Sequence, residues 1–442
     1  MTIGVVAARV DRAALIGLCL SGCVLLVFAA AAPLIVRRFE YAVFIPALVA
    51  SGLMTIAATR CAVYVPARTG LIIVLGFALA MRLVFVGVEP LLSTDLYRYI
   101  WDGRVQAAGI NPYLYVPADP ALAALRDAAI YPHINRADYA ITAYPPAAEF
   151  FFLAITRIAE TATMLRLAMV ACEIVIVAVV IDLLRQLALP VTGVVAYAWH
   201  PLAVFEIANN GHVEALMVAL MMLGLWLLLR AQRVGGAIAV TLAALAKPYA
   251  VLVLPAFWRP WDWRVPLAMI VTILICYLPY LGAGSGVFGF LGQGYLQEEG
   301  FISGSSIWLV ALLQTVLGPV TWLTPIYAAL AAAIMIAVGL RHRHDPARTP
   351  RDTIGAVIVL LTSGLVLMSP NYAWYFLALV PFIPLGAGAP AWTLTLGAFF
   401  LYRPVFFASH NELIWKTLAT LPFVLALVFV LSRVRRTHNA MA

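Results

Sequence analysis

Long apolar segments, separated by short polar ones, follow one another along nearly the whole chain. A helix needs about 20 apolar residues to cross the hydrocarbon layer of a membrane, and most of these segments have that length. The predicted membrane helices cover residues 13–36, 41–58, 69–90, 144–159, 163–186, 191–208, 213–230, 234–257, 265–284, 321–340, 353–369, 371–388, 391–408 and 413–432. Segments 144–159 and 305–317 are short enough for interfacial helices, so we expect about 11 to 14 crossings in an all-α, polytopic bundle.

The first apolar segment, 13–36, follows Arg9 and Arg12 and ends in a run of alanines. A basic flank, an apolar body and an end of small residues are also the features of a signal peptide. Because further apolar segments follow at once, we interpret 13–36 as a retained first helix.

The composition agrees with a membrane protein and excludes a soluble one. Hydrophobic residues make up 64% of the chain and charged residues 11%, and the mean hydropathy is +0.99. Soluble domains hold roughly 45–50% apolar and 25% charged residues. The net charge of +8 does not indicate a nucleic-acid partner, because the basic residues gather at short loops and near the C-terminal end, as the positive-inside rule describes.

No cofactor and no metal are expected. The five cysteines lie in or beside apolar segments without metal-ligand spacing, so we predict neither disulfides nor structural zinc. The sequence also contains no Gly-rich turn between a strand and a helix that would cradle a nucleotide. The sequence therefore gives no reason to expect a nucleotide-bound substrate.

Basic residues predict how the chain is oriented. Arg9 and Arg12 place the N-terminus inside, and Arg60 and Arg68 do the same for the end of the second helix, so residues 91–143 lie outside. The C-terminal arginines place the other terminus inside as well. We treat the chain as one membrane-embedded domain, 1–442. Its parts are the first three spans (1–90), a catalytic outer loop (91–143), core spans (144–284), a second outer loop (285–320) and C-terminal spans (321–442).

The first outer loop is too aromatic for a solvated linker, because it holds six tyrosines and Trp101. Residues 93–109, STDLYRYIWDGRVQAAG, predict a helix that begins just outside the membrane. Ser93 or Thr94 would cap its start, and Gly109 would end it.

One face of this helix carries reactive groups. The spacing i, i+3, i+4 and i+7 brings Asp95, Arg98, Tyr99 and Asp102 to one side of the helix. In one interpretation these side chains only pair with each other on an interfacial helix. In the other, the helix belongs to an active site, where a carboxylate takes a proton from an acceptor hydroxyl and cations hold a phosphate leaving group.

The two carboxylates are poorly placed as a close pair of nucleophile and acid, because seven helical residues rise by about 10 Å. A single base and an inverting displacement fit this geometry better. Asp95, nearer to the helix start and to the preceding span, is our predicted base, and Asp102 is the second choice. Arg98 and Tyr99 are predicted to contact the substrate.

Other polar residues lie inside or beside predicted spans. Glu149 lies one turn into 144–159, where it either lines a cavity or pairs with a basic residue. His212 and Glu214 belong to a polar turn that either contacts a sugar or phosphate oxygen or is an ordinary Asn-Gly turn. Lys247 precedes a proline inside an apolar segment, where it either clamps a phosphate or snorkels to the membrane surface.

Two aromatic residues, Tyr372 and Trp374, follow a Ser-Pro pair at the start of a predicted span. They form either a platform for a sugar ring or part of the aromatic belt that marks any membrane boundary. The belt is the simpler interpretation, and the platform is kept as a substrate-binding prediction.

Taken together, the motifs resemble the GT-C superfamily of membrane glycosyltransferases, most closely the bacterial mannosyltransferases that depend on polyprenyl-phosphate mannose. The resemblance is carried, within residues 90–381, by STDLYRYIWDGRVQAAGINPY, AYPPAAEFF, ANNGHVEALM, LAKPYAVLVLP and SPNYAWYFLALVPF. It implies an outward-facing cavity, a polyprenyl-phosphate sugar as donor, inversion at the anomeric carbon and a catalytic aspartate in the first large outer loop, a place that Asp95 takes. Two spans precede the usual first one, which is a departure from the family.

We therefore expect a transferase of the bacterial inner membrane that moves a sugar, mannose by resemblance, from a polyprenyl phosphate to a hydroxyl of a glycan or glycolipid on the periplasmic side. Two alternatives stay open. Glu149, Glu206 and Lys247 would suit the substrate path of a transporter or flippase for a lipid-linked or polar solute, although no internal repeat supports one. A non-catalytic assembly subunit would not need the acidic face of 93–109.

Overall fold

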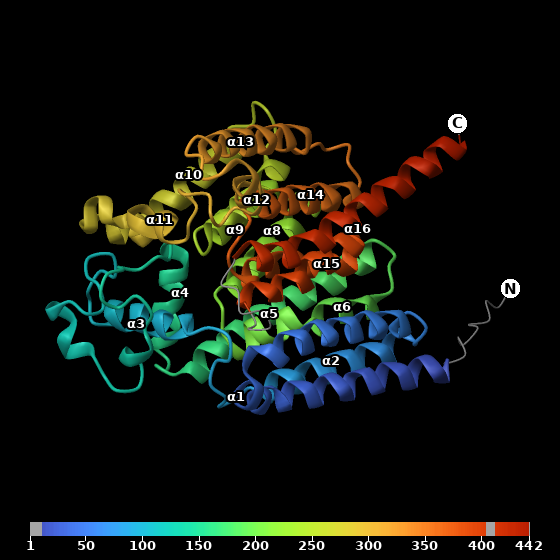
Figure 1. Cartoon of the computed structure of the whole chain (residues 1–442), viewed down its shortest axis with the longest axis horizontal. Coiled ribbons are helices and arrows are strands. Elements are labelled where there is room, and N and C mark those ends of the chain that lie inside the picture. Colours follow the sequence, from blue (N-terminus) through green and yellow to red (C-terminus); the bar gives the residue numbers. More distant parts are fainter. Residues whose placement is uncertain (1–10, 404–411, 442) are drawn as a thin grey trace.

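The computed structural model describes residues 11–403 and 412–441, and these ranges form helices without a β-strand (Figure 1). The predicted all-α, polytopic fold is confirmed, while Arg9 lies outside the described residues. Eight of the described helices are long and apolar enough to cross a membrane, or nine if one bent pair counts as a span. This number is below the expected range of about 11 to 14, because several predicted spans are broken into shorter helices.

The N-terminal part is a helical hairpin. Helix α1 (Arg12–Ala62) contains two candidate spans on either side of residues 39–40. Gly17, near the start of α1, lies against the side chain of Cys61, near its end. The two halves therefore run side by side, as the blue helices in Figure 1 show, and helix α2 (Ala67–Leu83) contacts them before the chain enters the first outer loop.

The bundle has two distinct ends. At one of them, which we call the loop end, Tyr41 donates a hydrogen bond to the carbonyl of Leu91 at 3.0 Å. The backbone amides of Leu91 and Leu92 donate hydrogen bonds to the side chains of Asn209 and Asn210, at 2.8 and 3.0 Å respectively. The polar turn that contains His212 therefore lies at the same end as the first outer loop.

The opposite end, which we call the basic end, joins several short connections. Arg233 forms an ion pair with Asp262, and the amide of His344 donates to the carbonyl of Trp258 at 3.0 Å. The start of α1 and the end of α16 also lie on this side, at the right of Figure 1. The connections at this end carry Arg60, Arg68, Arg185, Arg230, Arg233, Arg259, Arg264, Arg341, Arg343, Arg348 and Arg351.

The predicted span 144–159 does not cross the bundle. Helix α4 (Pro146–Thr156) instead lies along α3 (Asp95–Ala107), the helix predicted in the first outer loop. Just beyond α4, Glu160 accepts a hydrogen bond from Arg104 of α3 at 2.7 Å. Both ends of α4 therefore remain beside the outer loop.

The next spans connect the two ends. Helices α5 (Ala162–Gln186) and α8 (Glu214–Leu229) flank a broken span, whose halves Val191–Ala198 and Pro201–Asn209 meet at an angle of 58°. These halves consist of η3 (Val191–Val194), α6 (Val195–Ala198), α7 (Pro201–Ala203) and η4 (Val204–Asn209).

The predicted span 234–257 is a hairpin rather than a crossing. Helix α9 (Arg233–Ala244) leads away from the basic end, and the 3-10 helix η5 (Pro248–Phe257) returns to it. The ion pair between Arg233 and Asp262 holds the two ends of this hairpin together. Two short apolar helices have the same hydropathy as one long span, so the sequence pattern could not distinguish them.

Lys247 lies at the tip of this hairpin, which reaches the loop end. The backbone amide of Ala147, at the start of α4, donates a hydrogen bond of 3.0 Å to the carbonyl of Leu245. Pro248 has no amide hydrogen to continue the helical ladder and restricts the residue before it to extended backbone, and Lys247 has φ −143° and ψ 121°. The Lys-Pro pair therefore turns the chain back.

The remaining elements complete the bundle. In chain order they are η1 (Pro120–Leu125) and η2 (Tyr131–His133) in the first outer loop, then α10 (Arg264–Tyr277), η6 (Leu278–Phe288), η7 (Leu291–Tyr295), α11 (Leu296–Glu298), α12 (Trp308–Leu317), α13 (Leu323–Arg341), α14 (Pro350–Met368), η8 (Ala373–Phe382), η9 (Ile383–Ala387), α15 (Gly388–Gly397), η10 (Ala398–Tyr402) and α16 (Glu412–Met441).

The run from η8 to η10 folds back on itself. Gly386 and Gly388 have φ values of 116° and 65°, which glycine adopts without strain. The rings of Trp374 and Tyr402, at opposite ends of the run, have centroids 6.3 Å apart. Residues 373–402 therefore form two antiparallel arms that both reach the loop end.

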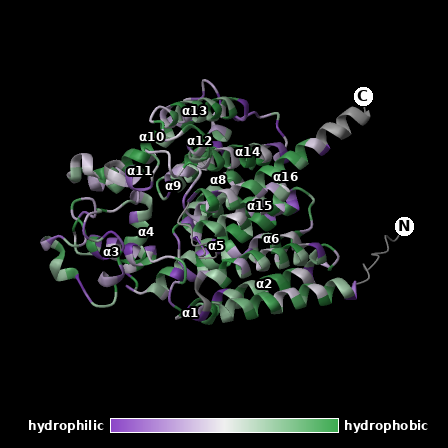
Figure 2. Ribbon diagram, in the orientation of Figure 1, coloured by the Kyte–Doolittle hydropathy of each residue, from purple (hydrophilic) through white to green (hydrophobic). Residues whose placement is uncertain are grey.

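The outer surface of the helices is apolar. Figure 2 shows hydrophobic residues along the bundle, with hydrophilic residues gathered around α3. Leu20, Val27 and Leu34 on α1 are each at least 60% exposed. Soluble monomers rarely expose such continuous apolar surface, so these side chains face lipid and the protein is a multi-pass membrane protein.

Candidate active site

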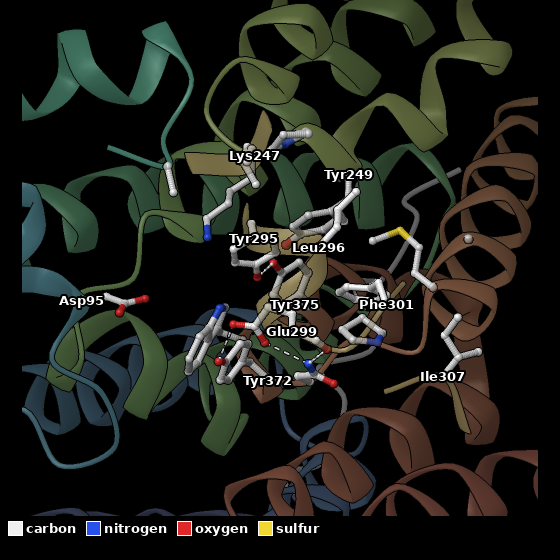
Figure 3. A pocket seen from close by; sticks show the side chains of 18 of the residues that line it. Asp95, Lys247, Tyr249, Tyr295, Leu296, Glu299, Phe301, Ile307, Tyr372 and Tyr375 are labelled. Atoms are coloured by element: carbon white, nitrogen blue, oxygen red, sulfur yellow. Dashed lines mark hydrogen bonds between the residues drawn. The ribbon is translucent and has the colours of Figure 1, made fainter. Parts of the chain in front are cut away.

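A cavity of about 980 Å³ lies at the loop end, where four distant parts of the chain meet (Figure 3). Its walls come from the start of α3, the first outer loop, the tip of the α9–η5 hairpin and the segments on either side of α11 and η8. Asp95 and Lys247 both point into the space between these elements. A predicted base and a predicted phosphate ligand thus share one cavity.

One limb of the cavity is apolar. It extends between η5, α13 and α14, where the lining side chains include Leu252, Ala331, Met335 and Leu367. Gly364 also lines this limb, and a Cβ atom there would lie 2.5 Å from the side chain of Leu252. The limb can therefore hold a slender hydrocarbon chain.

Asp95 is the first residue of α3, as the sequence predicted for a helix that begins beside the membrane. Its Oδ1 accepts a hydrogen bond from the side-chain amide of Asn135 at 2.8 Å, and its own amide donates to Oγ of Ser93 at 3.2 Å. The helix N-terminus carries a partial positive charge, which stabilises a carboxylate at this position. Asp95 is therefore both held in place and open to the cavity.

Lys247 brings a positive charge to the opposite wall. Its Nζ lies 3.1 Å from Oε1 of Glu214, which is fully buried. The rings of Tyr144 and Tyr375 flank the ammonium group, with centroids 5.2 and 5.6 Å away. Glu214 and the two rings stabilise a charged lysine, which can form charge-assisted hydrogen bonds to a phosphate.

A stack of rings forms part of the wall. Tyr372 lies on Trp374 with centroids 4.4 Å apart and planes 7° apart, and Trp374 in turn lies on His212 at 4.2 Å. Both Tyr372 and Trp374 line the cavity. Flat aromatic surfaces of this kind can face a sugar ring, whereas residues of a membrane belt would point outward to the lipid interface.

The two outer loops are linked across the cavity. Arg136 of the first loop donates to Glu298 at 2.5 Å and to Glu299 at 2.7 Å in the second. Glu299 also accepts hydrogen bonds from Tyr372 at 2.8 Å and from Asn371 at 2.9 Å, as the dashed lines in Figure 3 show. Glu299 therefore joins both loops to the start of η8.

The region from residue 38 to residue 261, just over half of the chain, matches the model of a family described as alpha-(1->6)-mannopyranosyltransferase, N-terminal domain. The chain belongs to this family. No curated protein and no solved structure matches it. The predicted resemblance to membrane mannosyltransferases is confirmed, and the matched region contains both Asp95 and Lys247.

Family membership makes the protein a glycosyltransferase and supports transfer of mannose to a glycan acceptor. The transporter and the assembly subunit, which the sequence left open, are therefore not favoured. Of the three polar residues that suggested a substrate path, Glu149 and Glu206 are fully buried in hydrogen-bonded networks, whereas Lys247 lines the cavity.

Four of the ten predicted site residues line the cavity of the mannosyltransferase, namely Asp95, Lys247, Tyr372 and Trp374. The other six lie outside its lining: Arg98, Tyr99, Asp102, Glu149, His212 and Glu214. Three of these six touch residues that do line it, since Glu214 pairs with Lys247, His212 stacks on Trp374 and the ring of Tyr99 lies against that of Tyr144. Contact of these residues with substrate stays a prediction.

Arg98 and Asp102 are paired with each other away from the cavity, which helical spacing alone could not show. The Nε of Arg98 donates to Oδ1 of Asp102 at 2.8 Å, and both side chains are at least 94% buried. The pair lies against α4 and the end of the first outer loop, where Arg98 also donates to the carbonyl of Ala140. Burial raises the pKa of Asp102, although Arg98 opposes this effect. The pairing interpretation therefore describes these two residues.

Asn135, Arg136 and Glu299 were not predicted as site residues, although all three line the cavity. Asn135 and Arg136 lie in an irregular part of the first loop, where no periodicity marks the direction of a side chain. Only 4% of the Glu299 side chain is exposed, because it is paired with Arg136 and accepts a hydrogen bond from Tyr372.

Proposed function

We propose that the protein transfers mannose from a polyprenyl phosphate to a hydroxyl group of a glycan or glycolipid, with inversion at the anomeric carbon and with Asp95 as the base. The observation that carries the proposal is the union of Asp95, Lys247 and the apolar limb in one cavity. The proposed donor has three parts that match this arrangement. Its sugar would lie near Asp95, its phosphate near Lys247 and its isoprenoid chain in the apolar limb.

In the reaction, the oxygen of the acceptor hydroxyl forms a bond to the anomeric carbon while the bond from that carbon to the phosphate oxygen breaks. The polyprenyl phosphate leaves with the bonding electron pair. Asp95 takes the proton of the attacking hydroxyl, which keeps positive charge from building up on that oxygen. Lys247 stabilises the negative charge of the departing phosphate.

Inversion follows from attack on the face of the sugar opposite to the phosphate. Asp95 and Lys247 project from different walls of the cavity (Figure 3), which suits a base on one face and a leaving group on the other. The family description names an α linkage. Inversion yields that linkage from a donor in which mannose is β-linked to the phosphate, so this anomer is the proposed donor.

We place the protein in the bacterial inner membrane with the cavity at the periplasmic side and both termini in the cytoplasm. The support is the distribution of charge, because short loops rich in arginine remain on the cytoplasmic side of a membrane. Arginines gather at the basic end, and the cavity lies at the other. A lipid-linked sugar in the outer leaflet could reach the apolar limb from the side.

The test is transfer of radiolabelled mannose from polyprenyl-phosphate mannose to endogenous acceptor in membranes that hold equal amounts of wild type, Asp95→Asn, Asp102→Asn or Asp138→Asn. Asp138 is an exposed aspartate of the same loop and serves as the matched control. Loss of a general base lowers the rate by roughly 10²- to 10⁴-fold, so Asp95→Asn should be nearly inactive and Asp138→Asn should equal wild type.

The outcomes separate the parts of the proposal. Wild-type activity in Asp95→Asn would refute the base, and equal losses in Asp95→Asn and Asp138→Asn would show that the loop tolerates no change of charge. If wild type transfers mannose from a nucleotide sugar but not from the polyprenyl phosphate, the lipid donor is wrong.

A further inference from the structure

We infer that Asn135 is a positioning residue that holds the Asp95 carboxylate in the orientation needed to take a proton from the acceptor. The inference rests on the proposed function, in which Asp95 is the base. It assigns a role to a residue of the irregular part of the first outer loop, 40 positions further along the chain than the aspartate it contacts.

Only one orientation of the Asn135 side-chain amide fits this contact. A carboxylate oxygen accepts hydrogen bonds and cannot donate them when ionised, so the group that faces it must be the Nδ2 of Asn135 rather than the Oδ1. Nδ2 lies 2.8 Å from Oδ1 of Asp95. Within residues 11–403 and 412–441, the side-chain hydrogen bond of the carboxylate is made through Oδ1, which in the proposed reaction leaves Oδ2 for the acceptor hydroxyl.

Asn135 is itself fixed from both sides. Before it, the ring of His133 is stacked on Tyr97 of α3 with centroids 4.6 Å apart. After it, Arg136 adopts a left-handed conformation with φ 57° and is paired with Glu299 of the second outer loop. A hydrogen-bond donor that is anchored to α3 and to both loops can orient a carboxylate with little loss of side-chain entropy on binding.

A hydrogen bond donated to a carboxylate fixes its orientation, so loss of the donor should lower kcat more than it changes KM. Other groups that interact electrostatically with Asp95 come from several elements. They are Tyr99 of α3, Tyr144 before α4, Glu206 of η4, His212 after it, Lys247 of the hairpin tip and Tyr402 of η10. Replacing Asn135 leaves all of these in place, which isolates the effect of the amide.

The experiment measures kcat and KM for both substrates in wild type, Asn135→Ala, Asn135→Gln and Asn135→Asp. A hydrogen bond to a charged group corresponds to about a 10- to 100-fold effect. Asn135→Ala should therefore lose about that factor in kcat with little change in donor KM.

The variants distinguish positioning from a merely structural role. Asn135→Gln keeps an amide donor and should restore part of the rate. Asn135→Asp removes the donor and places a second carboxylate against Asp95, so it should lose at least as much kcat as Asn135→Ala. An unchanged kcat in Asn135→Ala would overturn the inference, and so would equal losses of kcat in all three variants.

Failure of the inference can be told apart from failure of the proposed function. If Asp95→Asn is inactive while Asn135→Ala behaves as wild type, Asp95 remains the base and only the role of Asn135 is wrong. If Asp95→Asn is fully active, the base is wrong and the role of Asn135 falls with it. Should Asn135→Ala fail to accumulate in the membrane, the kcat values of the near-isosteric Asn135→Asp and of Asn135→Gln decide the question alone.

Discussion

Replacing Lys247 by methionine should weaken use of the donor. The substitution removes the ammonium group but keeps a long, unbranched side chain at the hairpin tip. A charge-assisted hydrogen bond contributes about 1.5–3 kcal/mol, so kcat/KM for the polyprenyl-phosphate donor should fall by about 10- to 150-fold. KM for the acceptor should change little, because in the proposed reaction its hydroxyl meets Asp95 on another wall.

The same substitution has a structural cost that must be separated from the kinetic one. Lys247 lies 3.1 Å from Glu214, whose side chain is fully buried. Removing one partner of a buried ion pair costs about 3–5 kcal/mol, so Lys247→Met should also unfold at a lower temperature in detergent. The double variant Lys247→Met/Glu214→Gln leaves no uncompensated charge and should recover stability without recovering the rate.

The assay is initial-rate transfer at varied donor concentration, with Lys247→Arg as the matched variant that keeps the charge. Lys247→Arg should retain more activity than Lys247→Met. The reasoning is refuted if the double variant regains both stability and wild-type kcat/KM, because the lysine would then serve only to neutralise Glu214.

Three further predictions concern the apolar limb, the ring stack and the bundle. Ala331→Leu narrows the limb and should raise KM for long-chain donors more than for a short-chain analogue in a chain-length series, whereas an equal change would contradict a lipid channel. Trp374→Ala removes a ring that lines the cavity and should lower kcat/KM by about tenfold, since aromatic contacts contribute about 0.5–1.5 kcal/mol beyond burial. Trp374→Phe keeps a ring and should retain most activity. Equal rates in both variants would argue against a platform. Arg82 is paired with the buried Glu173 at 2.5 Å. Arg82→Met leaves this carboxylate without its cationic partner and should destabilise the protein by about 3–5 kcal/mol. The double variant Arg82→Met/Glu173→Met should recover most of that loss in thermal unfolding, and additive losses would show that the pair contributes nothing.

Much of the fold could be predicted because hydropathy is a property of each segment. Helices such as α5 and α14 have nearly the bounds expected from the apolar pattern, and α3 begins at Asp95 as its capping residues indicated. The errors arose where a segment turns back. Segment 234–257 has a proline at its centre, but a kinked span and a hairpin are equally apolar, and only the contacts at both ends distinguish them.

The site was predicted only in part. Asp95, Lys247, Tyr372 and Trp374 line the cavity, and the sequence drew attention to each as a polar or aromatic residue next to apolar sequence, where such residues are costly or functional. Asp102 was misplaced because helical spacing gives the angle of a side chain about its helix but not the neighbour that the helix face meets.

The sequence by itself determined that this chain is an all-helical membrane protein, that a helix with acidic residues follows its third apolar segment, and that its motifs resemble those of membrane mannosyltransferases. Each of these conclusions depends on residues close together in the chain. Only the tertiary structure decided that residues 95, 135, 247 and 299 line one cavity with an apolar limb. The physical reason is that local sequence sets hydropathy and helical spacing, whereas the meeting of distant side chains is decided by how helices and loops fit together in three dimensions.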